Sequence, residues 1–436
     1  MGVTCPGVPR SNARIGGCRR AGMCRPVKRF LAVALGILTA IGGFVDIGDI
    51  VANAEAGARF GIAHAWVLLV GVIGICSYAE MSGRVAAVSG RPVFDLVRER
   101  LGPRMALANL AGSLLVTVLT LGAEIGGVGL ALQLATSVDY LLWVPVIAVV
   151  LWVVLWRAKF DTLENVFGLT GLVLVVFVIA AFRLGGDYGQ LWQQASHPGP
   201  PHGEDWGTYW FMAVALFASA MTPYEVFFFS SGAVEERWTT KDLLTSRINV
   251  FLGFPLGGLL AFALMVCSAL VFHPHGVSVD SLSQAAMPAA IALGKLGLAA
   301  AILGFFAATF GAAMETGLSS AYTVAQYFGW AWGKLRRPRE AARFHTVLIV
   351  SILVGMLVLL TTIDPIQLTE YTLVFSAVVL PLTYLPILVV ANDRGYLGKR
   401  ANGRFANAVG VLFLLVVVAA AVAAIPLMAT TRMGAG

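Results

Sequence analysis

Long apolar segments recur along the whole chain and are separated by short polar ones. Runs of about 20 residues with few charges are long enough to cross a bilayer as helices. We therefore expect eleven spans, at 30–52, 61–83, 105–135, 138–156, 163–182, 207–234, 248–272, 286–330, 344–363, 366–391 and 405–428. Only 12% of the residues are charged, against about 25% in soluble domains. The pattern predicts an all-α polytopic membrane protein and excludes a soluble globular one.

The basic residues are distributed unevenly over the segments between these spans. If the N-terminus is cytoplasmic, every lysine and arginine lies on the inner side except Arg59, Arg183, Lys295 and Arg432. This asymmetry follows the positive-inside rule and predicts a multi-pass protein of the cytoplasmic membrane with an external C-terminus. The net charge of +7 then reflects topology, so we expect the lipid bilayer and no nucleic acid as a partner. A monomer is compatible with the sequence.

The N-terminal tail, residues 1–29, is basic and is expected to be disordered. Its cysteines, Cys5, Cys18 and Cys24, lack the paired spacing of a zinc site. The Arg19-Arg20 pair and the later apolar run also resemble a cleaved signal. That run is long enough to span the membrane, however, so we expect it to be retained. No cofactor is expected.

Two predicted spans are interrupted by residues that break helices or carry charge. The first contains Gly42, Gly43, Asp46 and Asp49, although a charge at mid-bilayer costs roughly 3 kcal/mol. The span at 207–234 contains a proline, Pro223, between Thr222 and Glu225. Interrupted helices at the head of two equal halves are typical of transporters built from inverted repeats, with the substrate site between the breaks.

This pattern sets the expected organisation of the chain. Two inverted five-helix repeats occupy 30–183 and 207–392, an external loop occupies 184–206, and a loop with the eleventh helix occupies 393–436. The loop has turn residues and no apolar periodicity. His197 and His202 stand close to Glu204 and Asp205 there, but a solvated loop is favoured over a metal site.

The residues at the two breaks indicate a site for a hard cation. Hard divalent ions take oxygen ligands from carboxylates, carbonyls, hydroxyls and water. Asp46 and Asp49 supply carboxylates, Gly43 and Ser219 supply backbone carbonyls, and Thr222 supplies a hydroxyl. Because no thiolate or imidazole stands at these positions, the set suits Mg²⁺, Mn²⁺ or Ca²⁺ better than Cu⁺ or Zn²⁺.

Further acids lie within the spans and are weaker candidates for an ion pathway. Glu124 stands mid-span among glycines, Glu225 follows the second break, and Glu315 lies in the span at 286–330. Intramembrane acids mark ion or proton paths when they face a cavity. A protonated packing residue is the alternative, above all for Glu315.

The sequence resembles the Nramp family of divalent metal transporters in four places. "DIGDIVANAEAGARFG" is similar to the family's first-helix Asp-Pro-Gly-Asn motif with its Gly-Ala-x-Phe-Gly continuation, and "AMTPYEVFFFSS" to its sixth-helix Met-Pro-His-Asn region. "GAEIGG" resembles the third-helix Ala-Glu motif, and "VFSAVVLPLTYLPILVVANDRGYLG" the tenth helix. The resemblance implies a LeuT-like fold of ten core helices plus an eleventh, with helices 1 and 6 broken.

The departures from the family pattern have a common direction. The resemblance implies that Asp49 replaces an asparagine, Thr222 the soft methionine ligand, Ser219 an alanine and Ala377 a coordinating glutamine. Other replacements are Ile47 for the proline, Tyr224 and Phe229 for two histidines, and Leu121 for a third-helix aspartate. Tyr224 thus joins the weaker pathway residues. One carboxylate is gained while a sulfur ligand and several titratable groups are lost.

These departures are similar to those of the family's magnesium-transporting branch. They imply a secondary transporter, not an enzyme, that imports Mg²⁺ and Mn²⁺ by alternating access without proton coupling. The main alternative is a proton-coupled Mn²⁺/Fe²⁺ symporter of the standard family type, and a lesser one is a LeuT-like amino-acid or cation transporter. An intramembrane aspartyl protease is disfavoured because both acids lie on one segment.

Overall fold

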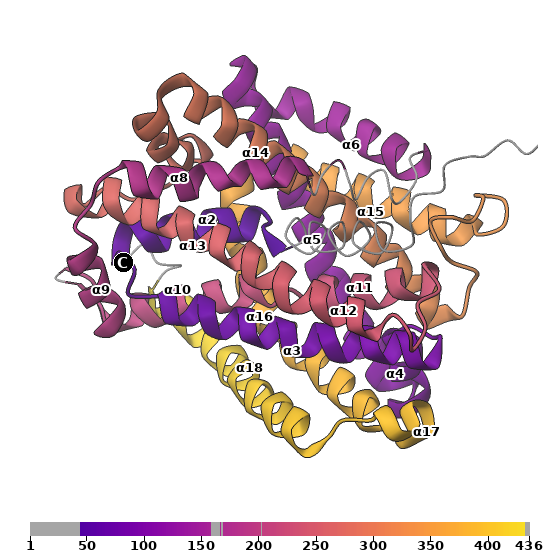
Figure 1. The fold of residues 1–436 in the computed structure, drawn as a ribbon. Helices are drawn as coiled ribbons and strands as arrows, with labels where there is room; N and C mark the ends of the chain where they lie inside the picture. The colour runs from indigo at the N-terminus through magenta and orange to yellow at the C-terminus, as the bar shows by residue number, and fades with distance from the viewer. Residues whose placement is uncertain (1–43, 158–165, 167–168, 202, 432–436) are drawn as a thin grey trace, which may run out of the picture.

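The computed structural model describes residues 44–157, 166, 169–201 and 203–431, and every regular element in this part of the chain is a helix (Figure 1). The expected all-α fold is therefore confirmed. The N-terminal tail and most of the first predicted span, including Gly43, lie outside the described residues.

Within the described residues, nine helical segments are long and apolar enough to cross a membrane. They are α3 (Ala65–Ser89), α5 (Pro103–Thr136), α6 (Tyr140–Arg157), α10 with α11 (Trp206–Ala220 and Pro223–Glu235), α12 to η3 (Leu243–His275), α14 (Leu282–Phe328), α15 (Ala342–Leu360), α16 (Pro365–Asn392) and α18 (Arg404–Thr431). A tenth is formed if the bent pair Leu169–Arg183 and Tyr188–Ser196 counts as one span. Each predicted span after the first thus has a counterpart.

Several shorter elements connect or interrupt these helices. They are α4 (Val93–Leu101), η1 (Leu172–Leu174) before α8 (Val175–Arg183), α9 (Tyr188–Ser196), η3 (His273–His275), α17 (Arg394–Leu397) and η4 (Gly398–Arg400). A π-helical turn, η2 (Asn249–Gly253), joins α12 (Leu243–Ile248) to α13 (Phe254–Val271). The segment predicted as an external loop, 184–206, contains the short helix α9, which Asp187 caps by accepting from the amides of Gly189 and Gln190.

The first span does not end at residue 52 as predicted. The helix α2 (Ile47–Phe60) begins directly after Asp46 and runs on to Phe60. A helix broken in its middle has two short halves, so the hydropathy of one uninterrupted helix misplaces its end. Asp46 and Asp49 therefore stand at the start of a helix that runs past the predicted end of the span.

The span predicted at 286–330 is divided in the structure. Gly294 has φ +65° and ψ −146°, so the helix axis is interrupted within α14. A residue with a Cβ rarely adopts this conformation. The 47 residues of α14 exceed the roughly 20 that cross a bilayer, and the break at Gly294 separates a short apolar segment from the longer helix.

The packing places α5 in the interior of the bundle and α18 at its periphery (Figure 1). The long α5 contacts α14, α15 and α16, while α2 packs along α13. Gly57 permits the close approach of α2 to α13, since a Cβ there would lie 2.2 Å from the carbonyl oxygen of Met265. This packing brings the start of α2 against α5 and α10 in the core.

Candidate metal site

The first break is defined by Asp46. Its backbone is extended, with φ −104° and ψ −177°, and its side chain caps α2 by accepting from the amide of Asp49 at 2.9 Å. Aspartate is a favoured capping residue because its carboxylate satisfies a free amide of the first turn. The sequence thus starts a helix at Ile47 and holds Asp46 and Asp49 together at its positive end.

The second break separates α10 from α11. Met221 ends α10 and Thr222 precedes Pro223, the first residue of α11. Proline is tolerated at the first helical position, where its missing amide hydrogen has no partner in any case. The last carbonyls of α10 lack intrahelical donors, so the backbone around Ser219 offers oxygen atoms near the break.

Ser219 joins the two breaks directly. Its hydroxyl donates to Oδ1 of Asp49 at 2.5 Å, and the carbonyl oxygen of Leu216 lies 3.4 Å from the same hydroxyl as a second acceptor. The sequence predicted only the Ser219 carbonyl as a donor atom. The structure adds the side chain, which contacts a carboxylate of the other broken helix.

Tyr224 forms a second link between the breaks. Its hydroxyl donates to Oδ2 of Asp46 at 3.2 Å, and its carbonyl oxygen accepts from the hydroxyl of Ser319 at 3.0 Å. Both oxygens of Asp46 therefore have a hydrogen-bond donor, one from Asp49 and one from Tyr224. Sequence reasoning ranked Tyr224 among the weaker pathway residues, whereas the structure places it in contact with Asp46.

Glu124 reaches the same place from α5. Its Oε1 accepts from the amide of Ile47 at 3.1 Å, so it satisfies a further free amide at the start of α2. Gly127 allows the approach, because a Cβ there would lie 2.4 Å from Cδ1 of Ile47. Glu124 therefore belongs to the residues around the first break, where its side chain contacts the backbone of α2.

Two carboxylate oxygens in this cluster have no hydrogen-bond partner among the described residues. These are Oδ2 of Asp49 and Oε2 of Glu124, and both residues are 0% exposed. Asp46 and Glu225 are also buried, at 3% and 5%. None of the ion pairs between described residues involves these four acids. Buried charge without a counter-ion is costly, so the cluster is suited to a cation.

Thr222 and Glu225 both lie at the start of α11. Thr222 is the N-cap residue of α11, and Glu225 lies in the first turn of that helix. The Thr-Pro-Tyr-Glu sequence has the spacing of a capping box, but the Thr222 side chain makes no capping hydrogen bond in the structure. Glu315 of α14 is half-buried and interacts electrostatically with Glu225 and Glu124.

The sulfur nearest the second break points toward another helix. A Cβ at Gly74 of α3 would lie 2.7 Å from Sδ of Met221, so this side chain packs between α10 and α3. The side-chain polar atoms that meet at the breaks are oxygens of Asp46, Asp49, Ser219, Tyr224 and Glu124. In the part of the chain that the structure describes, no three His, Cys, Asp or Glu residues converge closely enough to form a preassembled metal site.

The family-implied substitutions occupy packed positions. Leu121 and Ala377 are fully buried, and Phe229 is half-buried beside Gly83 of α3. Leu121 belongs to the apolar cluster that also contains Ile47 and Val51 of α2. Leu121, one turn before Glu124 on α5, therefore contributes packing and no charge.

Comparison with known proteins shows which family the chain resembles. The model of natural resistance-associated macrophage protein-like (Nramp) proteins matches residues 36–426. A divalent metal cation transporter MntH from Aeromonas hydrophila is 24% identical over 416 residues, covering 90% of this chain and 95% of the relative. MntH from Deinococcus radiodurans is 24% identical over 412 residues, covering 91% and 89%.

Solved structures agree on the fold. A manganese transporter of Eremococcus coleocola, in complex with an aromatic bis-isothiourea compound, superposes with a TM-score of 0.68 at 17% identity, covering 92% of this chain and 87% of that one. Mhp1, a nucleobase-cation-symport-1 family transporter, superposes with a TM-score of 0.56 at 17% identity, covering 90% and 91%. The expected LeuT-like transporter fold is thereby confirmed.

Proposed function

Because the chain belongs to the Nramp family, we propose that it carries divalent metal ions across a membrane by alternating access, with the two broken helices as the binding element. The curated relatives are named as divalent metal cation transporters and not as enzymes. The ion is the substrate and no resident cofactor is needed.

One observation carries the proposal. Asp46 and Asp49 meet at the start of α2, are buried, and face Ser219 and Tyr224 of the other broken helix. A cation of charge +2 offsets two carboxylates that have no basic partner among the described residues. An amino-acid substrate fits this end of α2 less well, since its carboxylate would meet two acids.

Manganese is the ion that the comparisons favour. The solved relative is described as a manganese transporter, and the curated relatives as transporters of divalent metal cations. Mn²⁺ accepts carboxylate, carbonyl and water oxygens, which is the donor set available here. The proton-coupled Mn²⁺/Fe²⁺ interpretation therefore has better support than transport of Mg²⁺ without coupling.

Magnesium is the second candidate, and it rests on the residues at the breaks. Thr222 stands where the family has its soft ligand, and the sulfur of Met221 packs toward α3. Mg²⁺ prefers oxygen and usually keeps several waters, so a sulfur-free site discriminates less strongly against it. The absence of proton coupling is likewise a proposal, motivated by Tyr224 in place of an imidazole beside Asp46.

Metal uptake into proteoliposomes, with the internal pH followed in the same vesicles, tests these proposals. Saturable Mn²⁺ uptake supports divalent metal transport. Competition by Mg²⁺ at comparable concentrations supports the second candidate, and Mn²⁺ uptake that excess Mg²⁺ does not reduce rules it out. Internal acidification that tracks metal uptake would contradict the uncoupled mechanism. A protein that takes up no divalent ion would contradict the proposed function.

A further inference from the structure

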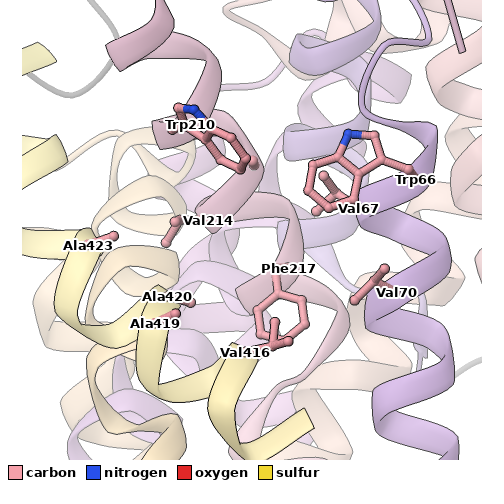
Figure 2. Close-up of a pocket in the computed structure, with 11 residues that line it drawn as sticks. Trp66, Val67, Val70, Trp210, Val214, Phe217, Val416, Ala419, Ala420 and Ala423 are labelled. Atoms are coloured by element: carbon pink, nitrogen blue, oxygen red, sulfur yellow. The ribbon is translucent and has the colours of Figure 1, made fainter. Parts of the chain in front are cut away.

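An apolar groove runs along the surface between α3, α10 and α18. Trp66 and Trp210 flank one end of it, and Phe217 and Val416 lie toward the other (Figure 2). Its volume is about 200 Å³ and its lining residues are all apolar. The groove is separate from the candidate metal site.

The shape of the groove follows from the residues of the three helices. α3 and α10 converge where a Cβ on Gly71 would lie 2.6 Å from Cβ of Ala220. The lining residues of α3, Trp66 to Val70, precede this contact, so the groove opens from it toward the tryptophan end. α18 contributes the small side chains Ala419, Ala420 and Ala423, which leave the space unfilled.

The tryptophans indicate where this end of the groove lies in the bilayer. Trp66 donates its indole N–H to the hydroxyl of Tyr209, and Trp66 and Trp210 contact edge to face. Tryptophan and tyrosine concentrate at the boundary between hydrocarbon and headgroups. The predicted orientation makes this the external boundary, because α3 and α10 begin here and α18 ends here. The groove therefore extends from the headgroup level into the hydrocarbon.

We propose that this groove binds an acyl chain of a lipid in the outer leaflet. A dry apolar cavity of about 150 Å³ is enough to bind a small hydrocarbon, so a groove of about 200 Å³ accommodates a segment of a chain. A helix of a second copy, about 10 Å in diameter, would need more room than the groove's volume of about 200 Å³. Water is disfavoured because the walls offer no polar partner.

The groove and the candidate metal site share the helix α10. Val214 and Phe217 of α10 line the groove, and Ser219 follows on the same helix with its hydroxyl on Asp49. A chain seated between α10 and α18 therefore packs against the helix that supplies one wall of the metal site. The binding itself does not depend on which ion the protein carries.

Quenching of tryptophan fluorescence by brominated acyl chains tests the proposal. The full chain is reconstituted in phosphatidylcholine vesicles with dibrominated acyl chains, and the contribution of Trp66 is the difference between the parent and Trp66→Phe. We then compare Ala423→Leu, which fills the groove, with Ala408→Leu, the same substitution at an exposed position of α18 outside it. Trp66 should lose its quenching in Ala423→Leu and keep it in Ala408→Leu.

Two results would overturn the acyl-chain proposal. Equal quenching of Trp66 in both variants would mean that no chain occupies the groove. Self-association of the parent that Ala423→Leu abolishes and Ala408→Leu preserves would assign the groove to a second copy. If Ala423→Leu or Trp66→Phe does not assemble, Ala420→Leu and Trp210→Phe provide the same comparison from other lining positions.

Discussion

The hydroxyl of Ser219 lies 2.5 Å from Oδ1 of Asp49 and donates a hydrogen bond to it across the two broken helices. This contact orients Asp49 so that its other oxygen, Oδ2, has no partner among the described residues. The hydroxyl also has an alternative acceptor in the carbonyl of Leu216. We therefore expect Ser219 to hold Asp49 with Oδ2 free for the proposed ion.

Ser219→Ala should weaken metal binding. The variant removes the donor to Asp49, and a hydrogen bond to a charged group contributes about 1.5–3 kcal/mol. Because this contact orients Asp49 with Oδ2 free, its loss leaves the carboxylate less well placed for the ion, and we expect KM for Mn²⁺ uptake to rise by about three- to tenfold. Ser77→Ala is the control, since the one hydrogen bond of the Ser77 side chain to the described residues is to the carbonyl of Ile73 in its own helix. An unchanged KM in Ser219→Ala would argue against this role.

Replacing Tyr224 should change how uptake depends on pH. Tyr224→Phe removes the donor to Asp46 and keeps the ring. Tyr224→His places an imidazole there, whose charge changes between about pH 5 and 8. The protonated imidazole repels the metal, so uptake by Tyr224→His should fall as the pH is lowered, relative to Tyr224→Phe. Initial rates of Mn²⁺ uptake across this range test the prediction, and parallel profiles would contradict it.

Thr222→Met should shift selectivity toward manganese. A thioether is a softer ligand than a hydroxyl and favours Mn²⁺ over Mg²⁺. The ratio of Mn²⁺ to Mg²⁺ uptake in mixed-ion proteoliposome assays should therefore rise. Thr346→Met is a suitable control because Thr346 is exposed on α15. If the ratio does not change, residue 222 does not face the ion.

Gly57→Ala should destabilise the protein. Alanine favours a helix over glycine by about 1 kcal/mol, but the added Cβ would lie 2.2 Å from the backbone oxygen of Met265. Overpacking of this kind costs about 1–3 kcal/mol, so the midpoint of thermal unfolding in detergent should decrease. Gly403→Ala, whose added Cβ meets no atom within 4 Å, should leave it unchanged. A higher midpoint for Gly57→Ala would show that α2 can move away from α13.

Much of the fold could be predicted because membrane spans are long and uniformly apolar. The spans from 61–83 onward correspond to described helices, since hydropathy over about 20 residues dominates the local signal. The end of the first span and the division at Gly294 could not be predicted in this way. Both depend on backbone conformation at one or two residues inside an apolar run.

The candidate site could be predicted in its residues but not in its contacts. Asp46 and Asp49 are conspicuous because buried charge is rare in a span, and Pro223 marks the second break. The hydrogen bonds from Ser219 and Tyr224 to these acids join residues 170 and 178 positions apart in the chain. Serine and tyrosine are common in helical packing, so their types alone do not reveal these partners.

The central claim is that the carboxylates at the start of α2 bind a divalent metal ion during transport. Mn²⁺ uptake into proteoliposomes by the parent and by Asp46→Asn tests it most directly, because asparagine retains the ability to cap α2 and removes only the charge. We expect Asp46→Asn to reduce uptake by at least about tenfold, which corresponds to about 1.4 kcal/mol, while its thermal unfolding midpoint stays close to that of the parent. Uptake at the parent rate by a correctly folded Asp46→Asn protein would contradict the account.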